Sequence, residues 1–91
     1  MIAKRIIFEG RVQGVGFRYT TKDLARGFDV CGSVENLADG SVEMKVMGEP
    51  GEIEDFLHEI THESAVAHHI QNVRSETIPP LEGMKGFRIE K

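Results

Sequence analysis

The chain has 91 residues, of which 40% are hydrophobic and 29% charged, and its 11 basic and 15 acidic side chains give a net charge of −4. This composition is typical of a small globular protein and excludes an intrinsically disordered one, which would carry fewer apolar residues. The acidic balance argues against a broad nucleic-acid-binding surface, because such surfaces neutralise phosphates with Lys and Arg. We therefore expect one domain, residues 1–91, without a nucleic-acid partner.

Cysteine content and the N-terminus bear on the cellular setting. The single cysteine, Cys31, cannot form an internal disulfide, and residues 1–5 do not begin a long apolar core of the kind found in signal peptides. No apolar run approaches the roughly 20 residues of a membrane span. We therefore expect a cytoplasmic protein without a membrane partner.

The N-terminal third predicts a strand followed by a helix. Residues 4–12 are rich in β-branched and aromatic side chains, which is typical of a strand. Residues 19–28 place Leu24 and Phe28 on one face at i,i+4 spacing, which predicts an amphipathic helix.

The middle of the chain predicts a hairpin followed by a second helix. Residues 30–35 and 42–46 alternate in polarity around an Asp39-Gly40 pair, a strong short-range hairpin signal. Pro50 suits the first turn of the next helix. The apolar residues of that helix fall at i, i+3, i+4 and i+7: Ile53, Phe56, Leu57 and Ile60.

The C-terminal third predicts two strands. Ile70 and Val73 indicate a strand over residues 67–76, and a short strand at 87–89 follows the Pro79-Pro80 interruption. The predicted order is therefore βαββαβ with a short extra strand. This order favours an α+β fold, the ferredoxin-like sandwich, in which two helices pack on one face of an antiparallel sheet.

The segment that joins the first strand to the first helix has the properties of an anion-binding loop. Glycine permits positive φ, and the first amides of a helix have no intrahelical partner. A phosphate would satisfy those amides, and the guanidinium of Arg18 can bind two of its oxygens. The predicted phosphate-binding amides are those of Gln13, Gly14, Val15, Gly16, Phe17 and Arg18. Because the segment matches neither the P-loop nor G-x-G-x-x-G, an ordinary strand-to-helix turn is the alternative.

Asn36, at the end of a predicted strand, is the candidate for orienting a water molecule. Its carboxamide both donates and accepts hydrogen bonds and is not repelled by a phosphate. Asparagine before a turn is also common turn chemistry, which is the alternative for this residue. Phosphoryl transfer to water needs charge stabilisation and an aligned nucleophile, the roles that Arg18 and Asn36 would fill.

These two motifs resemble the signature of the acylphosphatase family. Residues 10–18, GRVQGVGFR, are followed by residues 32–43, GSVENLADGSVE, and the similarity extends over essentially the whole chain to the closing residues 86–89. The resemblance implies hydrolysis of a small-molecule acyl phosphate to a carboxylate and inorganic phosphate, without a metal, a cofactor or a covalent intermediate. It also implies that Arg18 binds the phosphate and that Asn36 orients the water. We expect a free-standing, monomeric enzyme.

The sequence departs from the family pattern at several positions near these motifs. Ser33 stands where many members carry an aromatic residue, and Glu35 where a basic residue is frequent. Because side chains alternate along a strand, Glu35 should point to the face opposite Asn36.

Residues 58–62, HEITH, match a zinc-binding motif, and His68 falls at the spacing of a third ligand. The apolar stripe of the predicted helix faces away from His58 and His62, so we expect both to be exposed. Two alternatives to an acylphosphatase remain open. One is a zinc site at His58, His62 and His68, and the other is a non-catalytic anion- or ligand-binding ferredoxin-like module.

Overall fold

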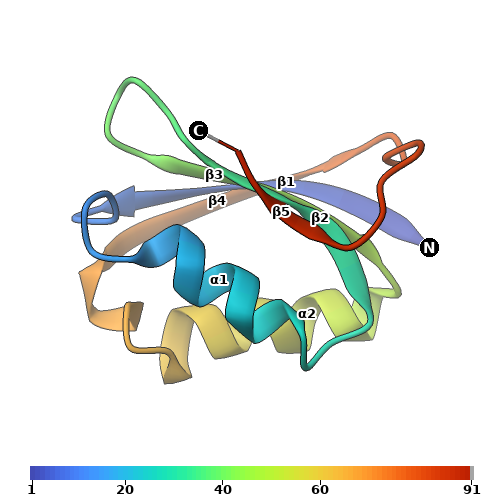
Figure 1. The fold of residues 1–91 in the computed structure, drawn as a ribbon, viewed down its shortest axis with the longest axis horizontal. Helices are drawn as coiled ribbons and strands as arrows, with labels where there is room; N and C mark the ends of the chain where they lie inside the picture. The colour runs from blue at the N-terminus through green and yellow to red at the C-terminus, as the bar shows by residue number, and fades with distance from the viewer. Residues whose placement is uncertain (91) are drawn as a thin grey trace.

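The computed structural model describes residues 1–90, which form one sheet and two α-helices (Figure 1). The elements in chain order are β1 (Ile2–Gly10), α1 (Phe17–Ala25), β2 (Val30–Asn36), β3 (Val42–Gly48), α2 (Pro50–His58), the π-helical turn η1 (Glu59–Glu63), the 3₁₀ turn η2 (Ala67–His69), β4 (Ile70–Ile78) and β5 (Phe87–Ile89). The predicted βαββαβ order with a short extra strand is confirmed.

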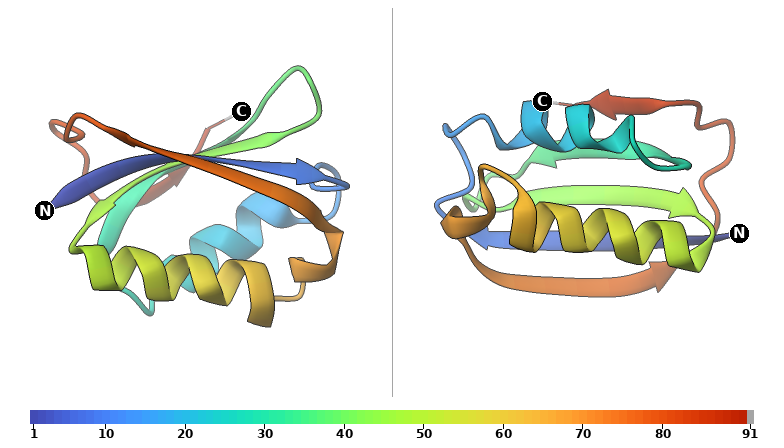
Figure 2. Two further views of the ribbon diagram at one scale, coloured as in Figure 1. Left: turned by 180° about the vertical axis from the view of Figure 1, so that it is seen from behind. Right: turned by 90° about the horizontal axis from the view of Figure 1, so that it is seen from below.

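The strands form one mixed sheet in the order β4-β1-β3-β2-β5. β1 pairs antiparallel with β3 and β4, and β2 pairs antiparallel with β3, as predicted. β5 differs, because it runs parallel to β2. The reason is topological: β4 ends at the end of the sheet where β2 begins, so the connection between β4 and β5 leads into a strand that runs in the direction of β2 (Figure 2).

Both helices cover the same face of the sheet, as predicted (Figures 1 and 2). The strand side chains on that face, among them Phe8 and Met44, are fully buried, and Phe56 of α2 packs into the same core. The burial of β3 alternates residue by residue, which matches the period of two of a strand with one covered face. No helix among residues 1–90 has the length and apolar character needed to span a membrane.

The bounds of several elements differ from the predicted ones by two or three residues. β1 ends at Gly10 because the pairing register with β4 shifts between Glu9 and Gly10. Val12 nevertheless remains buried, at 1% exposed. β4 begins at Ile70 and not at residue 67, because the three preceding residues form a 3₁₀ turn.

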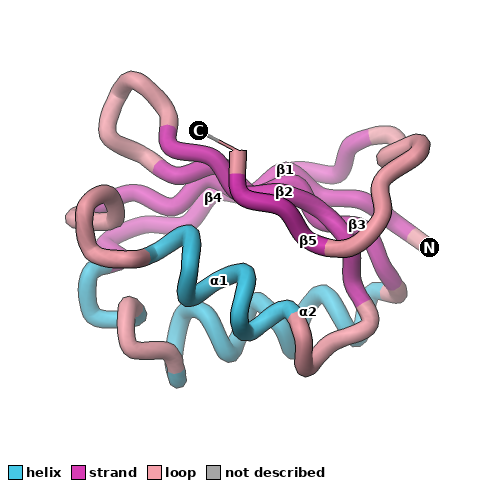
Figure 3. Tube along the Cα trace, in the orientation of Figure 1, coloured by secondary structure: helices cyan, strands magenta, loops and turns pink. Residues whose placement is uncertain are grey.

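Two connections that matter for the site lie at the same end of the sheet (Figure 3). The first, which we call the glycine loop, is residues 11–16 between β1 and α1. The second, the hairpin turn, is residues 37–41 between β2 and β3. The fold therefore brings the glycine-rich motif beside the strand end that carries Asn36.

Phe56 joins three parts of the core, and its replacement should be costly. Its ring centroid lies 5.5 Å from that of Phe28 and 5.7 Å from that of Phe87. We expect Phe56→Ala to lower the free energy of unfolding by about 3–5 kcal/mol, because it leaves a cavity in a fully packed site. Urea denaturation measures this loss, and Glu54→Ala on the exposed side of the same helix should change stability by less than about 0.5 kcal/mol. Equal losses in both variants would contradict the central position of Phe56.

Candidate active site

The glycine loop is held between two buried side chains. Val12 and Phe17 are 1% and 2% exposed, and the ring of Phe17 lies 5.0 Å from that of Phe8 between centroids. Between these anchors, Gly14 and Gly16 have φ values of 77° and 81°, in the left-handed region that glycine adopts without steric cost. A Cβ built on either glycine would meet no atom within 4 Å, and both glycines line the same pocket.

The backbone amides of the glycine loop are available to a ligand. Gly16 is the N-cap of α1 and has no side chain with which to cap the helix. The amides of Gln13, Gly14, Val15 and Gly16 donate to no backbone carbonyl within residues 1–90. The N-terminus of α1 adds amides without intrahelical partners and a partial positive charge. An anion at this position would therefore meet several N–H donors at once.

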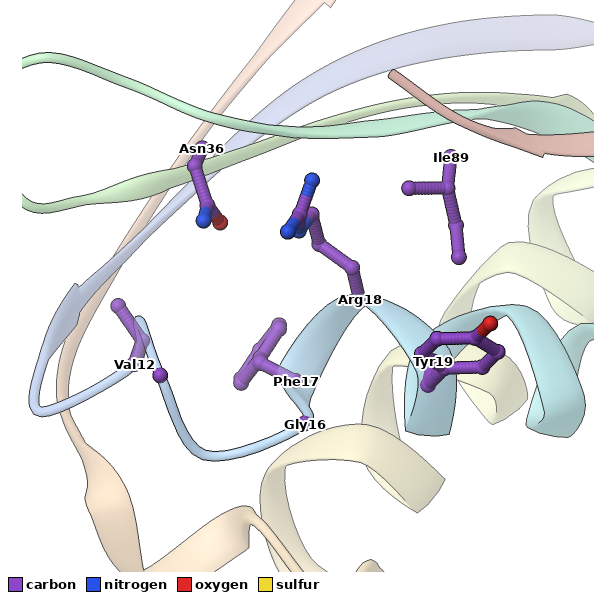
Figure 4. Close-up of a pocket in the computed structure, with 8 residues that line it drawn as sticks. Val12, Gly16, Phe17, Arg18, Tyr19, Asn36 and Ile89 are labelled. Carbon is purple, nitrogen blue, oxygen red and sulfur yellow. The ribbon is translucent and has the colours of Figure 1, made fainter. Parts of the chain in front are cut away.

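Arg18, on the first turn of α1, directs its guanidinium towards Asn36 (Figure 4). Its Nη1 donates a hydrogen bond to the backbone carbonyl of Glu90 at 2.9 Å. This bond uses one of the five N–H donors of the group, so the remaining donors can face an anion. The contact with the segment after β5 thus restrains the guanidinium without neutralising its charge.

Asn36 is the last residue of β2, where its backbone pairs with Val42 of β3. Its Oδ1 is buried and has no hydrogen-bond partner within residues 1–90. An unsatisfied buried oxygen costs about 1–3 kcal/mol, so such atoms are rare unless a ligand or a water completes them. The Oδ1 of Asn36 is therefore an unused acceptor within residues 1–90, and the hydroxyl oxygen of Thr21 is the other buried side-chain atom in this state.

These groups meet in one small pocket of about 120 Å³, lined by Val12, Gly14, Gly16, Phe17, Arg18, Tyr19, Asn36 and Ile89 (Figure 4). Pockets for drug-sized ligands occupy roughly 300–1,000 Å³, so this one fits a small group such as a phosphoryl group. The aromatic ring of Tyr19, at 78% exposed, and the side chain of Ile89 also line it. Sequence reasoning missed both. Tyr19 could have been found from its position beside Arg18, whereas nothing local places Ile89 there.

Two predicted phosphate-binding residues do not line the pocket. Val15 packs against the hydrophobic core. The side chain of Gln13 points to the hairpin turn, where its Nε2 donates to the backbone carbonyls of Leu37 at 2.7 Å and Ser41 at 2.9 Å. The backbone amides of both residues still belong to the glycine loop.

Residues 1–90 do not bring together the three ligands that the zinc-binding alternative requires. His58 and His62 are exposed, as predicted, with ring centroids 4.5 Å apart, and His68 is exposed as well. Residues 1–90 contain no group of three or more His, Cys, Asp or Glu side chains that could hold a metal ion. None of the three histidines lines the pocket of Arg18 and Asn36.

Glu35 lies on the face of the sheet away from the pocket, as strand alternation predicts. It stands opposite Glu43 of β3, and Glu43 is paired with Arg5 at 2.6 Å between the carboxylate and Nε. A carboxylate at position 35 is therefore not directed at an anion bound beside Arg18.

Comparison with known proteins decides the family. The acylphosphatase family model matches residues 4–89. The chain belongs to the acylphosphatase family. It is 40% identical over 87 residues to an acylphosphatase of Lacticaseibacillus paracasei, covering 96% of this chain and 90% of the relative. The predicted family, the ferredoxin-like α+β fold and the enzyme class are therefore confirmed.

Solved structures agree with this family assignment. The crystal structure of acylphosphatase from Bacillus subtilis matches with a TM-score of 0.86 and 32% identity over 100% of both chains. Full-length HypF in its phosphate- and nucleotide-bound form matches with a TM-score of 0.84 and 30% identity, over 99% of this chain but 12% of HypF. The fold of an acylphosphatase thus also occurs as one part of a much longer chain.

Asp39 in the hairpin turn makes the stability of the protein depend on pH. Its Oδ1 accepts hydrogen bonds from the side-chain hydroxyl and the backbone N–H of Ser41, which lower its pKa below the ordinary 3.8. A lowered folded-state pKa stabilises the protein above the unfolded pKa, and this contribution is lost as the pH falls through the folded pKa. We expect Asp39→Asn to be less stable than the parent at pH 7, with the difference shrinking below about pH 3.8. Urea denaturation at pH 7 and pH 3 measures it, and a difference independent of pH would contradict the assignment.

Proposed function

We propose that this acylphosphatase hydrolyses small-molecule acyl phosphates in the pocket formed by the glycine loop, Arg18 and Asn36, without a metal ion. The observation that carries the proposal is the buried Oδ1 of Asn36, which has no hydrogen-bond partner within residues 1–90 and shares a pocket with an arginine and loop amides that donate to no backbone carbonyl of those residues. A phosphate-binding module alone would need the cation and the amides, but not a buried oxygen that lacks a hydrogen bond. A hydrolase needs that oxygen to orient water.

The phosphoryl group is held by the loop amides and by Arg18. A phosphoryl group carries charge on three oxygens, and fixed N–H donors stabilise this charge best where no reorganisation is required during the reaction. The left-handed conformations at Gly14 and Gly16 fix the donors in advance. Arg18, restrained by Glu90, supplies the positive charge.

Water attacks from the side of Asn36. Its Oδ1 accepts a hydrogen bond from the water, whose oxygen forms a bond to phosphorus while the bond between phosphorus and the acyl oxygen breaks. The carboxylate leaves with the electron pair of that bond. The proton of the water passes to a phosphoryl oxygen of the substrate, a route that fits the pocket, because no carboxylate or imidazole among residues 1–90 lines it. The products are a carboxylate and inorganic phosphate.

We infer further that the enzyme is a single domain and acts as a cytoplasmic monomer without nucleic-acid partners. The single cysteine supports a reducing compartment, and the net charge of −4 argues against nucleic-acid binding. Light scattering on the purified protein tests the monomer directly.

Variants of the two central residues test the proposed reaction, with benzoyl phosphate as the substrate and a chelator present. We expect Asn36→Ala to lower kcat by roughly 100-fold with little change in KM, because it removes the group that aligns the water. We expect Arg18→Ala to lower kcat/KM by roughly 100- to 1,000-fold, because it removes charge stabilisation in both the bound and transition states.

The control is His62→Ala, which changes an exposed residue outside the pocket and should keep the parent's kcat and KM. Robust activity in both Arg18→Ala and Asn36→Ala would overturn the assigned roles. Activity of the parent that disappears only when the chelator is added would favour the metal-dependent alternative.

A further inference from the structure

One carboxamide side chain links the two loops that form the pocket. Gln13 Nε2 donates to the carbonyl oxygens of Leu37 and Ser41 at 2.7 and 2.9 Å. A glutamine NH₂ group has two hydrogens, so these two bonds use its full donor capacity. They join the glycine loop to the hairpin turn, segments that lie 24 and 28 residues apart in the sequence.

The two acceptors are the residues that close the hairpin turn. The N–H of Leu37 donates to the carbonyl of Ser41 at 2.9 Å, and the N–H of Gly40 donates to the carbonyl of Leu37 at 3.2 Å. Each carbonyl oxygen therefore accepts one bond from within the turn and one from Gln13, which matches its two lone pairs. Gln13 consequently binds the turn in its closed conformation and fixes it against the glycine loop.

Asn36 directly precedes Leu37, so this link restrains the backbone that carries the Asn36 side chain. Within residues 1–90 no hydrogen bond restrains the Oδ1 of Asn36 itself. The position of this oxygen relative to the loop amides therefore depends on the backbone that carries it, and the side chain of Gln13 ties that backbone to the loop by two hydrogen bonds. A misplacement of about 1 Å between reacting groups can cost roughly 100-fold in rate.

We propose that Gln13 is a positioning residue, which holds Asn36 in register with the glycine loop and acts on the reaction through Asn36. This inference rests on the proposed function. The side chain of Gln13 does not line the pocket, so it acts without touching the phosphoryl group. A link with only a structural role would lower stability but would have no selective effect on the attack of water.

Gln13→Met tests the proposal, because methionine has a similar length but no N–H donor. The kinetics of benzoyl phosphate hydrolysis and the inhibition constant for inorganic phosphate are measured in the parent and in the Asn36→Ala background. We expect kcat to fall about 10-fold in the parent background, with phosphate inhibition changed by less than about 2-fold. In the Asn36→Ala background the same substitution should change kcat by less than about 2-fold, because the group it positions is already gone.

The control is Arg5→Met, which removes long-range hydrogen bonds to Glu43 and Glu76 on the opposite face of the sheet. It should lower the melting temperature while leaving kcat within about 2-fold of the parent. Three results would overturn the proposal: an unchanged kcat in Gln13→Met, an equal loss of kcat in both backgrounds, or a loss of phosphate inhibition that matches the loss of kcat.

An NMR measurement that needs no turnover separates this proposal from the proposed function. The proposed function fails if the parent protein hydrolyses no acyl phosphate. The side-chain amide resonances of Asn36 are followed by ¹⁵N NMR. We expect Gln13→Met to shift or broaden them while the amides of Gly14 and Gly16 still respond to added phosphate. Asn36 resonances that are identical in Gln13→Met and the parent would overturn the positioning role whether or not the protein is active.

Discussion

The pocket proposed as the active site depends on the backbone between β1 and α1, which turns through two left-handed conformations. Gly14 and Gly16 provide them at φ values of 77° and 81°. A residue with a Cβ would pay about 1–2 kcal/mol at each position. The turn leaves the loop amides and the start of α1 facing one pocket, while Val12 and Phe17 fix the loop to the core. The loop is therefore ordered by folding alone, so an anion that binds there, as we propose, would not have to order it.

The hairpin side of the pocket obeys a different constraint. There the buried oxygen of Asn36 has no hydrogen-bond partner in the described part of the chain, whereas the carbonyls of Leu37 and Ser41 each accept two hydrogen bonds. The carbonyls of the hairpin turn are satisfied, and the only other buried side-chain atom without a partner within residues 1–90 is the hydroxyl oxygen of Thr21. This contrast between a satisfied turn and an unsatisfied side chain supports the proposed role of Asn36 in orienting water over ordinary turn chemistry.

Much of the fold could be predicted from local pattern. Pro50 and the apolar stripe around Ile53 and Phe56 predicted α2, and the Asp39-Gly40 pair predicted the hairpin, because both signals act within a few residues. The parallel pairing of β5 with β2 could not be predicted in this way. It depends on how the chain crosses from one edge of the sheet to the other.

The site was predictable to a similar degree. Arg18 and Asn36 followed from the motifs, and the structure brings them to one pocket. The hydrogen bonds of the Gln13 side chain to the hairpin turn and of Arg18 to Glu90 join residues 24 to 72 positions apart, so no periodicity or spacing could reveal them. The zinc motif at residues 58–62 shows the opposite case. Its spacing was suitable, but its side chains lie outside the pocket and are not joined by a third ligand within residues 1–90.

Binding of a phosphoryl group by the glycine loop and Arg18 underlies the proposed reaction, and a titration of ¹⁵N-labelled protein with inorganic phosphate tests it. We expect saturable shifts of the backbone amides of residues 13–18 and of the Arg18 guanidinium, and weaker binding with the same pattern of amides in Arg18→Ala. Saturable shifts centred on the histidines of residues 58–69, or no saturable shifts in the glycine loop, would contradict it.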